Sequence, residues 1–310
     1  MAIVVVGAVF VDVKGFPEDL YLPTGRNAGE IKFVHGGVGR NVAEDIANVE
    51  LRPTFVSMVD DTANGAEVLR KLRNHKVNTD YVITVPDGMG LWLAVFDNTG
   101  DLAGSISKRP KMEPMVELLD EKGDEIFRDC DSIVIEIDMD KEIVKRVFAY
   151  AAKYQKKVYA VVSNMVIASQ RRDFLQSIDC FVCNLLEAGI LFVDDFSALE
   201  PEDFVEVLYQ KICKANIPSM VVTMGSRGAV YASQSGERGY FPPESVKVRD
   251  TSGAGDAFCA GVAIALTYGK TIRESVVIGT HLAASVITIS ESTCPRFLPS
   301  ELGLNIEVAP

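Results

Sequence analysis

Strand-like and helix-like segments alternate along most of this chain of 310 residues, and this alternation constrains its fold more than any other feature. The predicted strands, rich in valine and isoleucine, are residues 3–11, 54–59, 81–85, 132–137, 157–162, 180–183 and 219–223. The predicted helices include residues 40–49, 63–75, 141–154, 201–215 and 271–289. Because strands that alternate with helices form largely parallel sheets covered on both faces, we expect an α/β domain.

Two segments break the alternation. Residues 13–35 are rich in glycine, proline and polar residues, while residues 91–96 and 102–107 flank a turn at 97–100 in the manner of a β-hairpin. Neither segment fits a β-α-β unit. We therefore expect a β lid formed by residues 13–35 and 88–108, and a large α/β domain formed by residues 1–12, 36–87 and 109–310.

Composition argues against several classes of partner. The formal net charge of −12 disfavours binding to nucleic acid and to anionic membranes, and no run approaches the ~18 apolar residues of a membrane span. The six cysteines are scattered, and the one close pair, Cys180 and Cys183, has no second pair or nearby histidine to complete a zinc site. We expect buried free thiols and a cytoplasmic location.

The segment with the most specific chemistry is Asp250-Thr-Ser-Gly-Ala-Gly-Asp256, which precedes an apolar helix-like run. Gly253, Ala254 and Gly255 let backbone N–H groups converge, and the helix start adds unpaired donors and the positive end of its dipole. This combination predicts an anion site, most naturally for phosphate. Asp256 is then placed to deprotonate a hydroxyl that attacks the phosphate; the structural alternative is a plain helix cap.

Other glycines and polar residues lie at predicted strand ends and turns. Asp12 ends the first predicted strand, where ligands gather in open α/β sheets, and it can bind two vicinal hydroxyls. Gly36 and Gly37 permit close backbone approach to a ligand, and Asn41 can both donate to and accept from a hydroxyl. A helix-capping glycine cluster is the alternative for this segment.

Two further groups suit a metal and a nucleotide. Asn184 and Glu187 follow a strand and share a helix face, and Glu187 is a hard oxygen ligand suited to Mg²⁺. The same pair also fits a capping box. Thr223, Gly225 and Gly228 offer a hydroxyl and close backbone contact to a nucleotide, or alternatively form a simple strand–turn–strand connection.

In this order along the chain, the motifs resemble the ribokinase-like (PfkB) carbohydrate kinase family over nearly the whole sequence. The resemblance implies a ribokinase-like three-layer α/β/α sandwich with a small β-sheet lid. It also implies ATP as phosphoryl donor, Mg²⁺, and a hydroxymethyl group of a sugar or nucleoside as acceptor. The sequence lacks the glycine fingerprints of a Rossmann-type dehydrogenase and of a Walker-type kinase.

The resemblance also implies a role for each site residue. Asp256 would be the catalytic base, with an anion hole formed by Gly253, Ala254 and Gly255. The residues that organise Mg²⁺, directly or through water, would be Asn184 and Glu187. The nucleotide site would include Thr223, Gly225, Gly228, Ser252 and His281. The residues that hold the acceptor would be Asp12, Gly36, Gly37, Arg40, Asn41 and Trp92. Because Asp256 stands at a helix start, we expect the dipole to favour its ionised form and to make it a weak base.

Some positions depart from the family pattern. Asp60 and Thr62 replace a glycine and an aspartate of the usual Val-Gly-x-Asp-x-x-Gly element. His281 stands where many members have asparagine near the adenine, and Ser292 replaces a glycine in a loop that helps bind a monovalent cation in some members. Asp250 is retained, so a K⁺ site that includes Asp250 stays a candidate.

The acceptor is predicted from fewer residues. Arg40 directly before Asn41 is similar to the pseudouridine kinase branch, and Trp92 could stack on a base or belong to the lid core. Lys108 and Arg109 could contact a sugar phosphate, although exposed basic residues are usually solvated. Pseudouridine is our sequence-based prediction. The alternatives are a free sugar or sugar acid (ribose, fructose, 2-keto-3-deoxygluconate), a sugar phosphate, and a catalytically silent sugar-binding regulator on the same fold.

The lid also predicts an assembly. Leu91, Leu93 and Val95 alternate along one predicted lid strand and would give the small sheet an apolar face. Such a face suits a homodimer that forms through the lid.

Overall fold

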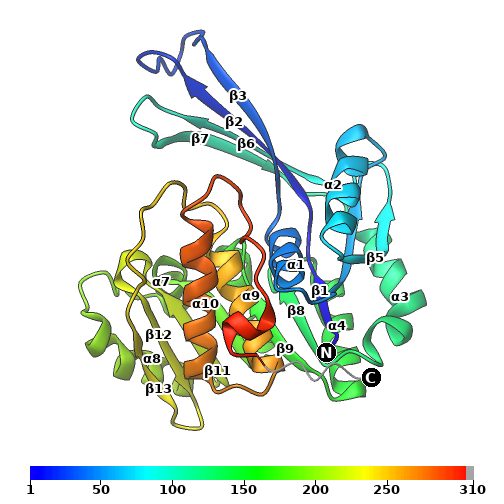
Figure 1. Cartoon of the computed structure of the whole chain (residues 1–310), viewed down its shortest axis with the longest axis vertical. Coiled ribbons are helices and arrows are strands. Elements are labelled where there is room, and N and C mark those ends of the chain that lie inside the picture. The colour runs from blue at the N-terminus through cyan, green and yellow to red at the C-terminus, as the bar shows by residue number, and fades with distance from the viewer. Residues whose placement is uncertain (305–310) are drawn as a thin grey trace.

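A large sheet dominates the computed structural model, which describes residues 1–304. Within these residues the strand order is β13-β12-β11-β10-β9-β8-β1-β4-β5 (Figure 1). The parallel strands are β1 (Ile3–Val6), β4 (Thr54–Val59), β5 (Asn78–Thr84), β8 (Ser132–Glu136), β9 (Lys157–Val161), β10 (Cys180–Asn184) and β11 (Ser219–Thr223). Two antiparallel strands, β12 (Ala229–Ser233) and β13 (Arg238–Phe241), extend one edge. Every residue of β1 and β8 is buried, as expected for strands covered on both faces.

Helices cover both faces of this sheet. Alternate residues of β1 divide between two cores, with Ile3 and Val5 in one and Val4 and Val6 in the other. The first core includes residues of α1 (Val38–Asn48), α2 (Ala63–Asn74), α9 (Ala254–Thr267) and α10 (Ile272–Val286). The second includes residues of α3 (Glu113–Phe127), α4 (Lys141–Tyr154), α5 (Met165–Ser169), α6 (Arg172–Leu175), α7 (Leu185–Phe192) and α8 (Pro201–Ala215). The predicted three-layer α/β/α architecture is therefore confirmed.

The prediction of one strand over residues 3–11 is wrong. β1 ends at Val6, and after three residues the chain enters β2 (Phe10–Pro17), which belongs to a different sheet. The break lies at Gly7, where α1 packs closely against the chain. A Cβ atom on Gly7 would lie 2.6 Å from the Cα atom of Gly39. The antiparallel strand β13 was not predicted, and β12 only as part of the alternative strand–turn–strand reading of residues 223–228.

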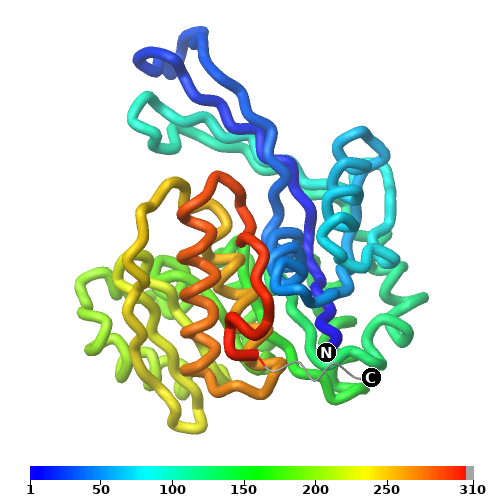
Figure 2. Tube along the Cα trace, viewed as in Figure 1, coloured from blue at the N-terminus to red at the C-terminus, as the bar shows by residue number. Residues whose placement is uncertain are grey.

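A four-stranded sheet projects from the large domain (Figures 1 and 2). Its order is β3 (Gly29–Gly36), β2, β6 (Gly90–Phe96) and β7 (Leu102–Lys108), and β6 and β7 form the predicted hairpin. Paired residues share a face, so the register places Phe33, Val13, Leu93 and Ile106 in one row. The next row, on the opposite face, contains Val34, Asp12, Trp92 and Ser107.

The strand order reverses beside β1. From β1 the chain builds outward through β4 to β5, and it then returns to β8 on the other side of β1 and continues through β9 to β11. Ligands bind open α/β sheets outside the carboxyl ends of the strands at such a switch point. The start of α1 and the last residue of β8 both lie there.

Two smaller predictions concern burial and membranes. Cys180 and Cys183 are buried as expected, whereas Cys213 is exposed. None of the helices within residues 1–304 has both the length and the apolar character needed to cross a membrane.

Candidate active site

The turn before α9 has the geometry of an anion site. Gly253 is the N-cap residue of α9 and adopts φ 80°, a left-handed conformation that favours glycine. A Cβ atom at this position would lie 1.9 Å from the backbone oxygen of Ser292. The turn therefore requires glycine for both its backbone angle and its close packing. The N–H of Ala254 donates to the oxygen of Thr251 at 3.3 Å, and the N–H groups of Gly255 and Asp256 remain available for an anion.

Asp256 is the third residue of α9 and not its cap. The N-cap is Gly253, and no side chain caps this helix. The Asp256 carboxylate instead accepts a hydrogen bond from Asn41 Nδ2 at 2.6 Å. The capping alternative for Asp256 is therefore wrong, and the contact joins the starts of α1 and α9 in one site.

Burial raises the pKa of Asp256 to about 6. The hydrogen bond from Asn41 and the charge of Arg40 lower the pKa, while the carboxylates of Glu187 and Asp12 raise it further. The expectation that Asp256 is a weak base considered the helix dipole alone, whereas burial shifts the pKa of Asp256 in the opposite direction. A carboxylate with a pKa near neutrality is a better general base.

The residues predicted to hold the acceptor come from the small sheet and α1. Asp12 was predicted to end the first strand of the large sheet. It lies instead within β2 of the small sheet. A Cβ atom on Gly36 would lie 2.6 Å from each carboxylate oxygen of Asp12. Gly37 is the N-cap residue of α1 with φ 102°, and a Cβ atom there would lie 2.4 Å from the oxygen of Ala8. Gly36 therefore permits the close approach of the Asp12 carboxylate, and Gly37 permits the start of α1 to pack against residues 8–10.

Trp92 lies beside Asp12 on the small sheet. The two residues are register partners in the parallel pair β2–β6, so their side chains stand on the same face. Trp92 is partly buried, which leaves part of its indole accessible. An aromatic ring next to a carboxylate that suits vicinal hydroxyls matches the two parts of a nucleoside.

Glu136 is a site residue that the sequence reasoning missed. It is 4% exposed and accepts hydrogen bonds from the backbone N–H groups of Ala8, at 3.2 Å, and of Gly39. Burial raises the pKa of Glu136, and the neighbouring Asp138 raises it further. The signal was present in the sequence, because Glu136 is a carboxylate that ends an apolar strand at the edge where ligands gather.

Asn184 and Glu187 form the capping box that starts α7. Asn184 N–H donates to Glu187 Oε2 at 2.8 Å, and Glu187 N–H donates to Asn184 Oδ1 at 2.9 Å. Burial raises the pKa of Glu187, and Asp138 raises it further. Glu187 Oε1 takes no part in the box, so the capping role leaves one carboxylate oxygen for a cation.

A cavity of about 570 Å³ lies between the anion turn and the antiparallel edge of the large sheet. Among the predicted nucleotide and anion residues, those that line it are Thr223, Gly225, Gly228, Ala254 and Gly255. His281 does not line the cavity, but its neighbour Thr280 does, and His281 Nδ1 lies 3.0 Å from Oε1 of Glu244, another lining residue.

Residues 2–296 match the family described as pfkB family carbohydrate kinase. The chain belongs to this family. The predicted family resemblance is thus confirmed, and with it the activity of an ATP-dependent phosphotransferase that acts on a sugar or a nucleoside.

Individual PfkB relatives match the chain along nearly its whole length. It is 35% identical to guanosine-inosine kinase of Exiguobacterium acetylicum over 292 residues, and this match covers 94% of this chain and 95% of the relative. It is 29% identical over 276 residues to pseudouridine kinase of Escherichia coli (strain K12), covering 88% of this chain and 86% of that one. Among solved structures, Arabidopsis thaliana ribokinase complexed with ribose and ATP has a TM-score of 0.80 at 21% identity, covering 99% of this chain and 100% of the other.

The Asp250 side chain in this PfkB kinase is engaged within its own turn. Asp250 Oδ1 accepts a hydrogen bond from the N–H of Ser252 at 2.8 Å. Partial burial raises the pKa of Asp250, but the hydrogen bonds from Ser252 lower it, and the net shift is downward. The carboxylate is therefore ionised. Ser252, predicted to lie in the nucleotide site, therefore supports the turn that leads to α9.

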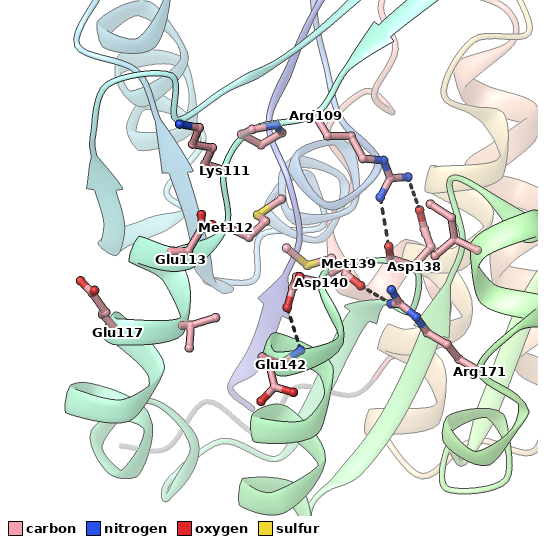
Figure 3. Close-up of a pocket in the computed structure, with 13 residues that line it drawn as sticks. Arg109, Lys111, Met112, Glu113, Glu117, Asp138, Met139, Asp140, Glu142 and Arg171 are labelled. Atoms are coloured by element: carbon pink, nitrogen blue, oxygen red, sulfur yellow. Dashed lines mark hydrogen bonds and ion pairs between the residues drawn. The ribbon is translucent and has the colours of Figure 1, made fainter.

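A second cavity, of about 610 Å³, lies at the root of the small sheet of this PfkB kinase (Figure 3). Two of the basic side chains that line it are bound by protein groups: Arg109 Nη2 lies 2.7 Å from Asp138 Oδ2, and Arg171 donates to the oxygen of Met139. Just outside the cavity, Lys108 pairs with Asp87 at 2.7 Å. The hypothesis that Lys108 and Arg109 contact a sugar phosphate is therefore disfavoured by this geometry.

Proposed function

We propose that this PfkB kinase transfers the γ-phosphoryl group of ATP to the hydroxymethyl group of a nucleoside. The observation that carries the proposal is the row formed by Asp12 and Trp92 on one face of the small sheet. The carboxylate suits the ribose hydroxyls and the indole suits the face of a base. A purine riboside is our first candidate, because the relative at 35% identity is a guanosine-inosine kinase. Pseudouridine, the sequence-based prediction, is the second candidate because of the relative at 29% identity.

In the proposed reaction Asp256 takes the proton from the acceptor hydroxyl. Its 2.6 Å hydrogen bond with Asn41 fixes the carboxylate at the point where α1 and α9 meet. The N–H groups at the start of α9 face the charge that develops on the transferred phosphoryl group. Asp12, Asn41 and Glu136 hold and orient the sugar ring, so catalysis rests on positioning and charge stabilisation.

Glu187 and Asn184 suit Mg²⁺. Among the described residues no group of three or more acidic, histidine or cysteine side chains could hold a metal ion alone. Mg²⁺ is commonly bound by one or two carboxylates together with substrate phosphates. The raised pKa of Glu187 reflects burial and the negative charge of Asp138. A bound cation would stabilise the ionised form of Glu187 against both. When bound, Mg²⁺ would neutralise charge on the phosphates.

K⁺ has a weaker basis in these residues. The Asp250 carboxylate is ionised and lies one turn before the anion site. We propose Asp250 as the carboxylate that a monovalent cation would use, and a comparison of rates in K⁺ and in a tetraalkylammonium salt tests this role.

The small sheet serves as a lid and as a dimer surface in this proposal. Phe33 is 69% exposed and Ile106 is 70% exposed, and both lie on the face opposite Asp12. Such exposed apolar residues suit contact with the same face of a second copy. The face that carries Asp12 and Trp92 then closes over the acceptor and excludes water from ATP.

The experiment that tests the function is ADP release from Mg²⁺-ATP with a panel of acceptors. The panel contains guanosine, inosine, pseudouridine, uridine, ribose, fructose, 2-keto-3-deoxygluconate and fructose 6-phosphate. We expect the highest kcat/KM with a purine riboside. A preference for pseudouridine keeps the nucleoside proposal and reverses its order, whereas a preference for a free sugar or sugar phosphate rejects it. ATP binding without turnover on any acceptor favours the silent regulator.

A further inference from the structure

Arg40 is a buried cation with two of its three guanidinium nitrogens, Nη1 and Nη2, bound by protein groups, while Nε has no partner within residues 1–304. Its side chain is 1% exposed, and Nη1 lies 2.7 Å from Oε2 of Glu44, which is also 1% exposed. Nη2 donates to the backbone oxygen of His35 and to Ser292 Oγ at 3.3 Å. Because both Nη groups are bound by the protein and the whole side chain is buried, Arg40 is poorly placed to bind an acceptor directly.

The partner of Arg40 reaches the same distant loop. Glu44 Oε1 accepts a hydrogen bond from Thr293 Oγ1 at 3.0 Å and also lies 3.2 Å from Lys71 Nζ. Glu44 thus links Arg40 to the residue that follows Ser292. The ion pair and the loop therefore form one connected network.

The loop is held along α1 by further hydrogen bonds. The N–H of Cys294 donates to Asp45 Oδ1 at 2.6 Å, and Asn48 Nδ2 donates to the oxygen of Cys294 at 2.6 Å. Both acceptor and donor side chains on α1 are buried. Residues 292–294 are thus tied to α1 through side chains that water does not reach.

The other side of this loop touches the anion turn. The backbone oxygen of Ser292 occupies the space in which a Cβ atom on Gly253 would lie. Ser292 Oγ also lies 3.5 Å from Asn41 Oδ1, and Asn41 in turn donates to Asp256. A shift of residues 292–294 would therefore move both the N–H groups at the start of α9 and the hydrogen-bond partner of Asp256.

We propose that Arg40 is a positioning residue for phosphoryl transfer. Together with Glu44 it clamps residues 292–294 between α1 and the Gly253 turn, and it does not contact the acceptor. The proposal rests on the proposed kinase function and deepens it, because it assigns to the Arg40–Glu44 pair the alignment of the anion turn with Asp256.

The charges around Asp256 predict a second measurable effect of Arg40, on the pH dependence of the rate. The acidic groups coupled to Asp256 come from several elements: Asp12 of β2, Asp45 of α1, Glu136 of β8 and Glu187 of α7. Arg40 is the cation that lowers the pKa of Asp256. Loss of its charge should therefore move the acid limb of the rate profile to higher pH.

The test compares Arg40→Met and Arg40→Lys with the control Arg70→Met, which removes an arginine whose side chain is 67% exposed. We expect Arg40→Met to lower kcat by about 100-fold, as small displacements of reacting groups do, with KM for nucleoside and for Mg²⁺-ATP within about threefold of wild type. Arg40→Lys keeps the charge, so it should keep the wild-type acid limb while kcat stays low. Arg70→Met should leave all values unchanged.

Hydrogen–deuterium exchange gives a readout that needs no activity. Arg40→Met and Ser292→Ala should both speed exchange in peptides that cover residues 290–296, and peptides of α10 should be unaffected. The double variant Arg40→Met with Glu44→Gln avoids an unpaired buried charge and covers the case in which Arg40→Met alone fails to fold.

Two results would overturn the clamp. One is a rise of tenfold or more in the nucleoside KM of Arg40→Met at unchanged kcat, which would show direct acceptor binding. The other is unchanged exchange at residues 290–296 in the variants that fold. If the wild-type chain transfers phosphate to no acceptor, the proposed function fails, and the exchange experiment still decides whether the clamp exists.

Discussion

Replacement of Asp256 by asparagine should stabilise the folded chain at neutral pH. Burial raises the pKa of Asp256 from 3.8 to about 6, so its ionisation is less favourable in the folded chain than in the unfolded one. The difference between these two values corresponds to roughly 3 kcal/mol. Asparagine has nearly the same size and keeps an oxygen that can accept the hydrogen bond from Asn41.

The predicted gain depends on pH in a defined way. Below the unfolded value of 3.8 the carboxyl group is protonated in both states and contributes nothing. Between 3.8 and about 6 the unfolded chain ionises first and the penalty on the folded chain grows, until it is complete above about 6. The two pKa values give a penalty of about 1 kcal/mol at pH 4.5 and about 3 kcal/mol at pH 8.

Urea denaturation of wild type and Asp256→Asn at pH 4.5, 6 and 8 measures this difference. The advantage of the variant in free energy of unfolding should grow by about 2 kcal/mol between pH 4.5 and pH 8. Asp250→Asn is the matched control in the same turn, and it should lose stability at pH 8 because hydrogen bonds lower the pKa of Asp250. A pH-independent difference, or an Asp256→Asn chain that is less stable at pH 8, would refute the assigned role of burial.

Four further outcomes follow from the site. Asp256→Asn should lower kcat by ~10²–10⁴ at unchanged ATP affinity, and wild-type kcat/KM should fall as the pH drops through about 6, because the base must be ionised; near-normal turnover of the variant would contradict the assignment. Trp92→Ala should raise KM for inosine at least tenfold more than KM for ribose, measured by ADP release; equal effects would remove Trp92 from base binding. Glu187→Gln should raise the Mg²⁺ concentration for half-maximal rate, whereas Glu202→Gln on the exposed start of α8 should not. Ile106→Glu should convert a dimer into a monomer in light scattering, and a wild-type monomer would end the lid-dimer proposal.

Local sequence patterns predicted the elements of the large domain well. The strands at 54–59 and 219–223 and the helices at 141–154 and 201–215 have the predicted bounds, because their periodicity and flanking residues agree with their burial. The strand at 3–11 was misjudged, since both halves are apolar and the break at Gly7 depends on the approach of Gly39. No sequence pattern near Gly7 predicts its contact with Gly39, which lies 32 positions further along the chain.

The candidate site was predictable only where a motif is contiguous. The anion turn at Gly253 was found because its glycines and its helix are adjacent in the sequence. Glu136 was missed because its two backbone donors come from Ala8 and Gly39, which lie on other elements. The direction of the pKa shift of Asp256 was missed for the same reason, since its largest cause is burial, which depends on distant segments.

The short connection between β1 and β2 has a consequence for how the acceptor is bound. Only residues 7–9 separate a central strand of the large sheet from the strand of the small sheet that carries Asp12, and Figure 2 shows the chain running without a detour from one sheet into the other. Asn41 belongs to the large domain, whereas Asp12 belongs to the small sheet. In the proposed acceptor site, one wall therefore belongs to the large domain, and the other would move with any displacement of the small sheet relative to that domain. An acceptor that bridges the two walls would couple its own capture to closure, so ATP alone would meet an open and incomplete site.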